Sequence, residues 1–386
     1  MKLVSQYQQL MMAPGPTNVP PRILQAMLQP VINHRGPEFK ELYQGMIRKA
    51  KQVFQTKGDV FFLTSSGTGT VECAIQNIVP HNGKVLVQVN GFFSERLSDG
   101  IKAHGGKPVP LPCEWGEAPN FQDFEKIIRR EKDLSLIAVL YNETSTGATT
   151  RCMKELGELC DEQDIPLMVD AISILGGDQL PVDEWNVDLC ITASQKCLMC
   201  PPGLGLISVS EGAWDRIRKN QTRHGYYFDL QSFKKYQEEG FTPFTPSLPL
   251  YYALDEALNM ILEEGLEARF RRHKKCADAS YAGAEAIGLE SLTKGSTRSN
   301  TVIALNNPLG VQVQKLLELL RSKYRVVLAG GVGKLRDKIF RIGNMGTISA
   351  AEVTGTLGAL ESALQDMNYK FKAGAGLAAA SAKLRT

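Results

Sequence analysis

The sequence predicts an α/β fold, in which helices cover a mostly parallel sheet and a smaller α+β region follows. Short β-branched runs alternate with amphipathic segments across the first half of the chain, a pattern typical of parallel sheets. Ligands bind to such sheets beyond the carboxyl ends of the strands. We expect strands at residues 60–64, 84–89, 134–141, 166–170, 188–192 and 205–209.

The segments between these strands have helical spacing. In residues 152–162 the apolar positions Met153, Leu156 and Leu159 recur every three or four residues, which predicts a helix with one buried face. A long helical pattern begins at residue 250 and continues to about residue 287. Beyond it we expect strands at 300–305, 326–328 and 339–342 and helices at 312–321 and 351–367. The tail, mostly alanine and glycine, is expected to fray.

Composition favours an ordinary soluble globular protein. Of 386 residues, 43% are apolar and 22% charged, and a prior of about 150 residues per domain suggests two domains. The formal net charge of +3 includes no basic block long enough to indicate nucleic-acid binding. The most basic stretch, residues 268–275, is interpreted as the solvated face of a helix.

The compartment predicted from the sequence is the cytoplasm. No apolar stretch approaches about 18–20 residues, and the first ten residues have no signal-peptide core. The eight cysteines lack the regular spacing of a secreted disulfide framework. Cys197 and Cys200 form a C-x-x-C pair without a second ligand pair, so no metal site is expected. Two packed thiols are favoured, and an oxidation-sensitive pair stays open.

Three predicted strands end in residues that can bind a cofactor. Lys196 follows the strand at 188–192 and precedes a loop rich in proline and glycine. Asp170 ends the strand at 166–170, and the glycine-containing segment 65–70 follows the strand at 60–64. A lysine at a strand end can be desolvated until its amine becomes nucleophilic. Most lysines after a strand are nevertheless solvated, so each signal is weak alone.

Together the three groups match pyridoxal 5'-phosphate (PLP) better than any other cofactor. Its aldehyde needs an amine, its ring nitrogen needs a carboxylate, and its phosphate needs backbone N–H groups at a helix N-terminus. Lys196, Asp170 and segment 65–70 supply these in chain order. The alternatives, in which no cofactor binds, are a solvated lysine, a helix-capping aspartate and a loop without a ligand.

Several short motifs resemble class V aminotransferases of PLP fold type I, and most closely the alanine–glyoxylate / serine–pyruvate group. The resemblance extends from Met12 to about Met367. The motifs that carry it, in chain order, are residues 14–22 (PGPTNVPPR), 66–68 (SGT), 90–93 (NGFF), 143–147 (ETSTG), 169–171 (VDA), 194–196 (SQK), 201–203 (PPG) and 341–343 (RIG).

The resemblance implies catalytic roles for two residues. Lys196 would bind the cofactor aldehyde and, once displaced by substrate, carry the proton between the substrate Cα and the cofactor. Asp170 would pair with the ring nitrogen. The other cofactor-binding residues that the resemblance implies are Ser66, Gly67, Thr68 and Gln195 at the phosphate, Phe93 and Ile172 on the two ring faces, Thr144 at the phenolic oxygen, and Thr245 from a neighbouring subunit. Phe93 departs from the tryptophan of eukaryotic relatives.

The resemblance also implies where the substrate binds. Arg341 would hold its carboxylate through two parallel hydrogen bonds, and Gly15 would bring a backbone amide to the same end. His34 and Arg35 have no role that transfers. Through Thr245, the resemblance also implies a homodimer with shared active sites.

The leading interpretation is a ping-pong transaminase that moves an amino group from alanine or serine to glyoxylate or pyruvate. Two alternatives stay open: another class V activity, such as aspartate or 2-aminoethylphosphonate–pyruvate transamination, and a catalytically silent subunit of a redox assembly. Cysteine desulfuration is disfavoured because no cysteine follows Cys276. The predicted division is an N-terminal arm (1–20), a large cofactor-binding domain (21–264), a small C-terminal domain (265–370) and a flexible tail (371–386).

Overall fold

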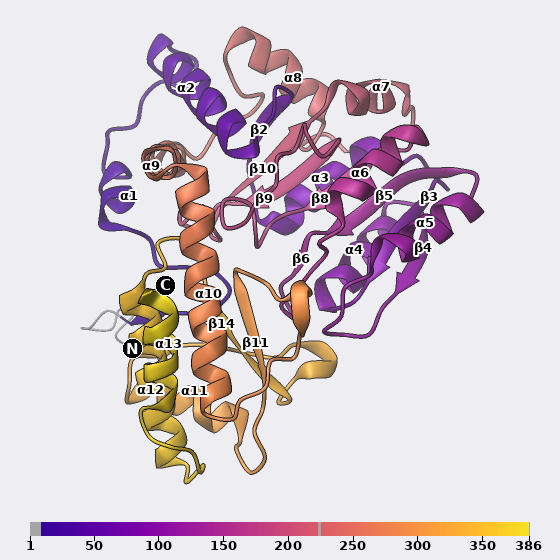
Figure 1. Ribbon diagram of the computed structural model, residues 1–386. Helices are drawn as coiled ribbons and strands as arrows, with labels where there is room; N and C mark the ends of the chain where they lie inside the picture. The colour runs from indigo at the N-terminus through magenta and orange to yellow at the C-terminus, as the bar shows by residue number, and fades with distance from the viewer. Residues whose placement is uncertain (1–8, 223–224, 386) are drawn as a thin grey trace.

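Two sheets of different size organise the chain. The computed structural model describes residues 9–222 and 225–385, so the first eight residues of the predicted arm and Thr386 of the predicted tail lie outside it. In Figure 1 the larger sheet and its helices fill the upper part of the view, and the long helix α10 leads down to the smaller sheet.

The larger sheet has seven strands in the order β2-β10-β9-β8-β5-β3-β4. Only β10 runs antiparallel to its neighbours, so the other six strands share one direction. The six strands predicted from β-branched runs are all present, with ends that shift by one residue at most. Their bounds are Asp59–Thr64 (β2), Lys84–Val89 (β3), Leu134–Leu140 (β5), Leu167–Asp170 (β8), Leu189–Ala193 (β9) and Leu204–Val209 (β10).

Both faces of this sheet are buried, because alternate strand residues enter two different cores. In β2, Val60 and Phe62 join one core, whereas Phe61 and Leu63 join the other. One face is covered by α2 (Pro37–Phe54), α5 (Phe121–Arg130), α6 (Met153–Glu162) and α9 (Leu248–Glu264). The opposite face is covered by α3 (Gly67–Ile78), α4 (Phe92–Ala103), α7 (Glu211–Lys219) and α8 (Leu230–Glu239).

Strand β4 (Lys107–Pro112) was not predicted, because it contains three prolines. Pro108, Pro110 and Pro112 alternate along a strand at the edge of the sheet. Proline cannot donate a ladder hydrogen bond, and an edge strand needs donors on one side only. The prolines therefore fit here and leave no edge of unpaired N–H groups on that side.

Helices α9 and α10 (Leu266–Ala286) replace the single long helix predicted from residue 250 onward. They are separated by Gly265, whose φ of +80° ends α9. Left-handed backbone of this kind favours glycine. The smaller sheet follows, in the order β11-β14-β13, with bounds Val302–Asn306 (β11), Ala329–Gly330 (β13) and Ile339–Gly343 (β14).

A separate core lies between this sheet and α10, α11 (Val313–Ser322) and α12 (Ala350–Asp366). The N-terminal region joins it through β1 (Leu10–Met11), which pairs in parallel with β12 (Val326–Val327). Short helix α1 (Pro21–Ala26) then leads toward α9, and a two-stranded ribbon of β6 (Asn142–Glu143) and β7 (Ala148–Thr149) lies beside the larger sheet. The predicted domain boundaries stay a prediction.

The expectation of a frayed tail is wrong for the described residues, because α13 (Ala375–Arg385) is a helix packed on α10 and α12. The carboxylate of Glu361 accepts hydrogen bonds from the amides of Gly374, Gly376 and Leu377, at 2.7, 2.8 and 3.1 Å. A carboxylate at a helix N-terminus is stabilising. Alanine and glycine let this helix approach α10 closely. No helix among the described residues is long and apolar enough to cross a membrane.

Candidate active site

A cavity of about 440 Å³ lies at the carboxyl edge of the larger sheet. It is lined by the segments that follow β2, β3, β5, β8 and β9, because parallel strands bring their carboxyl ends to one edge. Most of the predicted site residues lie together here: Ser66, Gly67, Thr68, Phe93, Thr144, Asp170, Ile172, Gln195 and Lys196. Arg341, Gly15 and Thr245 are not among the lining residues.

Lys196 lies in the turn after β9 and points into this cavity. Its amine donates a hydrogen bond to the carbonyl of Pro14. Desolvation by the surrounding protein, with a smaller effect from the positive charge of Arg341, lowers the pKa of Lys196 from 10.5 to about 8. Near neutral pH a useful fraction of this amine is therefore unprotonated and nucleophilic.

Asp170 ends β8 and faces the same cavity. Its carboxylate accepts a hydrogen bond from the amide of Ile172, at 2.9 Å. Desolvation, with a smaller contribution from Glu143, raises the pKa of Asp170 to about 7, against the lowering effects of that hydrogen bond and of Lys196. A nearby cationic group would offset the cost of its burial.

The N-terminus of α3 forms a cradle for an anion. Ser66 is the N-cap, and its hydroxyl accepts a hydrogen bond from the amide of Gly69 at 3.3 Å. The first amides of α3 have no carbonyl partner within the helix and carry the positive end of its dipole. A Cβ at Gly67 would lie 2.9 Å from a methyl carbon of Ile172, so only glycine fits without a shift.

Arg96 was not predicted, although it lines the cavity beside this cradle. Its guanidinium donates a hydrogen bond to the Thr68 hydroxyl at 3.3 Å. On α4, Arg96 lies three residues after Phe93, so both fall on one helix face. That spacing was the one signal available in the sequence.

Glu143 was also missed as a site residue. It is fully buried, and its carboxylate accepts hydrogen bonds from the amides of Ser94 (2.8 Å), Ser145 (3.0 Å) and Phe93 (3.4 Å) and from the Ser145 hydroxyl (2.6 Å). It thus caps α4 and fixes the backbone from which Phe93 enters the cavity. A Cβ at Gly91 would collide with this carboxylate.

Arg341 extends from β14 and is almost entirely buried. Its Nε and Nη2 donate to the carbonyl of Gly330 at 3.1 and 2.7 Å, and its Nη1 donates to the carbonyl of Thr144 at 2.9 Å. Desolvation lowers the pKa of Arg341 to about 10, with Glu143 acting in the opposite direction. The guanidinium therefore lies directly behind Thr144, which lines the cavity.

The amide of Gly15 donates to the carbonyl of Ala13 at 2.7 Å. Its predicted role at the substrate carboxylate stays a prediction. Gly15 also makes room for Lys196. It has a φ of +94°, and a Cβ there would lie 2.5 Å from Cδ and 2.6 Å from Nζ of Lys196.

Thr245 is exposed and lies outside the cavity of its own chain. The loop before it is bound by Arg35, whose guanidinium donates to the carbonyls of Thr242 and Pro243 at 2.5 and 3.1 Å. Arg35 also lies over the rings of Tyr236 and Phe241. Arg35 therefore holds the loop that presents Thr245.

Cys197 and Cys200 are buried behind Lys196. Burial raises the pKa of Cys197 to about 12 and raises that of Cys200 as well. Thiols with raised pKa values are poor nucleophiles, which favours packed thiols over a redox pair.

Gly15→Ala should disturb the lysine as well as the backbone. Left-handed backbone costs a non-glycine residue about 1–2 kcal/mol, and the new methyl group must displace the Lys196 side chain. We expect lower stability and weaker PLP binding, measured by chemical unfolding and by absorbance titration.

Gly310→Ala is the matched control, because Gly310 has a φ of +81° and open space at the Cβ position. It should lose similar stability and keep full PLP affinity. Equal PLP binding by both variants would show that Gly15 does not set the position of Lys196.

Comparisons with known proteins agree with this geometry. The family model of class-V aminotransferases matches residues 10–333. An uncharacterised aminotransferase of Methanocaldococcus jannaschii is 44% identical over 95% of each chain. The small subunit of a soluble hydrogenase of Synechococcus sp. is 35% identical over 98% of each chain. A serine–glyoxylate aminotransferase of Methylorubrum extorquens is 35% identical over 96% of this chain and 95% of its own.

A solved structure gives the same result for the fold. The ureidoglycine–glyoxylate aminotransferase of Bacillus subtilis superposes with a TM-score of 0.94 and 30% identity, over the whole of both chains. Its match confirms the predicted fold type I. The chain therefore belongs to the class-V aminotransferase family and is a PLP-dependent transaminase of that family.

Proposed function

We propose that this transaminase moves an amino group from a small amino acid, alanine or serine, to a small 2-oxo acid, glyoxylate or pyruvate, by a ping-pong mechanism. The observation that carries the proposal is the buried amine of Lys196, with a pKa lowered to about 8, in one cavity with Asp170 and an anion cradle. Relatives named for serine–glyoxylate and ureidoglycine–glyoxylate transfer support glyoxylate as an acceptor.

The lining residues fit PLP. Its phosphate would lie at the first amides of α3, beside Ser66, Thr68 and Arg96. Gln195, which also lines the cavity, would donate a side-chain N–H group to the phosphate. Phe93 and Ile172 would contact the two ring faces and Thr144 the phenolic oxygen.

Asp170 would hold the ring nitrogen in its protonated form. A cationic nitrogen beside this carboxylate lowers the cost of its burial, which is the cause of its raised pKa. When bound, PLP supplies an aldehyde that takes the amino group and a ring that accepts the electron pair left at Cα.

Lys196 would act as both acceptor and donor of the Cα proton. Its amine lies in the cavity at the end of β9, and its lowered pKa keeps part of it unprotonated at neutral pH. Proton transfer is efficient when the pKa of the base lies near the working pH. Glu143 serves indirectly, because it holds the α4 backbone that carries Phe93.

Arg341 would hold the substrate carboxylate. Of its five N–H groups, three donate to carbonyls of Gly330 and Thr144. Two remain, one on each terminal nitrogen, which is the number that a bidentate carboxylate needs. Clamping the carboxylate aligns the Cα–H bond for proton removal. Selectivity for alanine or serine rests on the cavity walls and not on Arg341.

A homodimer with shared sites would explain why Thr245 is exposed. Arg35 fixes the loop that presents it, and a loop held in this way can reach a second subunit. Large apolar side chains are also exposed at Leu28, Val31 and Tyr226, as expected for surfaces that a partner covers. All eight cysteines are free thiols, which supports a cytoplasmic location.

The alternative of a silent subunit is kept because two relatives are named as soluble hydrogenase subunits. The intact lysine, aspartate and cradle argue against it, since a non-catalytic subunit has no need of a desolvated amine. Another class V activity would keep the same cofactor residues and change the acceptor.

A half-reaction tests transamination directly. The PLP-loaded enzyme, mixed with alanine or serine alone, should release one equivalent of 2-oxo acid per site, and glyoxylate added afterwards should be converted to glycine. Lys196→Ala should do neither, because the Cα proton has no acceptor. Lys132→Ala, at an exposed loop lysine, serves as the control and should behave as the wild type. A wild-type enzyme that binds PLP and releases no 2-oxo acid would support the silent-subunit alternative.

Hybrid dimers test whether Thr245 acts across subunits. Lys196→Ala and Thr245→Val proteins, each impaired alone, should regain about a quarter of wild-type turnover when exchanged, because random pairing gives half the dimers one intact site. Exchange of Lys196→Ala with Asp170→Asn should restore nothing, since both residues belong to one chain's site. Recovery in the control pair, or none in the first pair after verified exchange, contradicts sharing of the site.

A further inference from the structure

Arg341 and Lys196 belong to different sheets, so contacts between the two parts of the molecule must fix the distance between them. Lys196 follows β9 of the larger sheet, whereas Arg341 lies on β14 of the smaller sheet. Nη1 of Arg341 reaches the other side through its hydrogen bond to the carbonyl of Thr144, which lies between β6 and β7 beside the larger sheet. One hydrogen bond of this kind is worth little unless the backbones on both sides are held.

Residues 293–299, which lead into β11, contact residues 146–148, which lead into β7. Thr293 donates its hydroxyl proton to the carbonyl of Thr146 at 2.9 Å, and the amide of Ser299 donates to the carbonyl of Gly147 at 3.0 Å. Arg298 forms an isolated antiparallel bridge with Ala148. Residues 146–148 begin two positions after Thr144, so these contacts lie close to the cavity wall.

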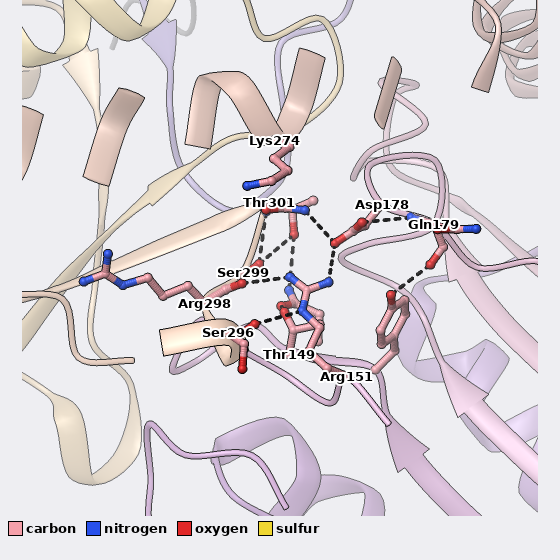
Figure 2. Close-up of polar contacts among 12 residues, drawn as sticks. Thr149, Arg151, Asp178, Gln179, Lys274, Ser296, Arg298, Ser299 and Thr301 are labelled. Atoms are coloured by element: carbon pink, nitrogen blue, oxygen red, sulfur yellow. Dashed lines mark hydrogen bonds and ion pairs between the residues drawn. The ribbon is translucent and has the colours of Figure 1, made fainter. Parts of the chain in front are cut away.

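Arg151 lies at the centre of the contacts between the segment that precedes β11 and the larger sheet's side of the molecule, as Figure 2 shows. We call this region the junction. Its Nη1 donates to the Asp178 carboxylate at 2.7 Å, its Nη2 to the carbonyl of Arg298 at 2.8 Å, and its Nε to the carbonyl of Ser296 at 3.2 Å. The same Asp178 oxygen accepts from the side-chain amide of Asn300 at 2.8 Å. Arg151 and Asp178, which lie on the larger sheet's side, thus hydrogen-bond to three residues of the segment before β11. These are Ser296, Arg298 and Asn300.

This segment is stiffly connected to the strand of Arg341. The Ser299 hydroxyl accepts from the amides of Thr301 and Val302, both at 3.0 Å, which fixes the start of β11. Strand β11 then pairs antiparallel with β14, with Ala304 opposite Arg341. A shift of residues 296–300 is therefore transmitted through the ladder to the guanidinium.

The charges at the junction are engaged with one another, which argues against an anion site here. A cavity of about 650 Å³ lies beside it, lined in part by Arg151, Lys274 and Arg298. Each of these cations has a carboxylate partner, in the pairs Arg151–Asp178, Lys274–Asp278 and Arg298–Glu285, at 2.7, 2.8 and 2.5 Å. The Arg151–Asp178 pair is the one that joins the two sides, and Asp178 is almost buried.

We propose that Arg151, acting through Asp178 and Asn300, is a positioning residue that sets Arg341 at the substrate carboxylate. The inference rests on the proposed function, because it assumes that Arg341 binds this carboxylate. Arg151 itself touches neither the cavity nor the cofactor residues. Its loss should therefore weaken recognition of carboxylates and leave the cofactor aldehyde equally reactive.

Two probes separate these effects without turnover. Aminooxyacetate and O-methylhydroxylamine both condense with the aldehyde of the bound cofactor, and only aminooxyacetate has a carboxylate. The ratio of their second-order rate constants measures the contribution of the carboxylate. Arg151→Lys keeps a positive charge near Asp178 and loses the planar fork that reaches both carbonyls.

For Arg151→Lys we expect the aminooxyacetate rate to fall about ten- to a hundred-fold, as a misplacement near 1 Å predicts, while the O-methylhydroxylamine rate stays unchanged. The KM for the amino donor should rise more than kcat falls. Asn300→Ala removes the other hydrogen bond to the Asp178 oxygen that Arg151 contacts and should shift the ratio in the same direction. Arg216→Lys, at a partly exposed arginine that pairs with Asp164, is the control and should change neither rate.

Arg341→Lys identifies which proposal fails. If Arg341→Lys lowers the ratio and neither Arg151→Lys nor Asn300→Ala does, the positioning role is overturned and the proposed function stands. An equal fall in both rates in the Arg151 variant indicates general damage to the fold and also overturns the role. If Arg341→Lys itself leaves the ratio unchanged, Arg341 is not the carboxylate clamp, and the positioning role is overturned with that part of the proposed function.

Discussion

Exclusion of water from the carboxyl edge of the larger sheet determines the chemistry of this protein. Lys196 and Asp170 keep only the surface that faces the cavity, and desolvation is the largest cause of both pKa shifts. The lysine is made easier to deprotonate and the aspartate harder to ionise. Each shift costs folding free energy, because a charged form is disfavoured by burial. Such a cost is typical of groups that are retained for a ligand and a reaction.

The fold supports this edge from three directions. Parallel strands deliver the anion cradle, Asp170 and Lys196 from segments distant in sequence. Glu143 caps α4 and thereby fixes Phe93 and the backbone around it. The smaller sheet brings Arg341 behind Thr144, and the Arg151 junction holds that sheet in place. The site is thus assembled by contacts between elements, and no single loop carries it.

Strand positions and the lysine, aspartate and cradle were predictable from the sequence, because β-branched runs and strand-end residues are local signals. The edge strand β4 was missed, since prolines at alternate positions read as a loop until the strand is known to lie at an edge. The C-terminal helix α13 was missed because its stability comes from Glu361 and from packing on α10, which are distant in sequence.

Arg96, Glu143 and Arg151 were missed for the same reason: their partners are set by the tertiary fold. The close contact between Gly15 and Lys196 was missed as well, since packing between residues distant in sequence cannot be seen in a motif.

The measurement that tests this account most directly is the titration of Lys196 in the PLP-free protein. Lysine labelled with ¹³C at Cε reports each protonation step by NMR, and Lys196→Ala assigns the signal. Because desolvation and the charge of Arg341 lower the pKa of Lys196 to about 8, we expect the midpoint of this titration near pH 8. The amine would then be mostly protonated below that pH and mostly neutral above it. Replacing Arg341 by glutamine should raise the midpoint, because a repelling charge is removed. A midpoint close to the ordinary value of 10.5 would contradict the account, since the lysine would then be a solvated side chain and not a desolvated nucleophile.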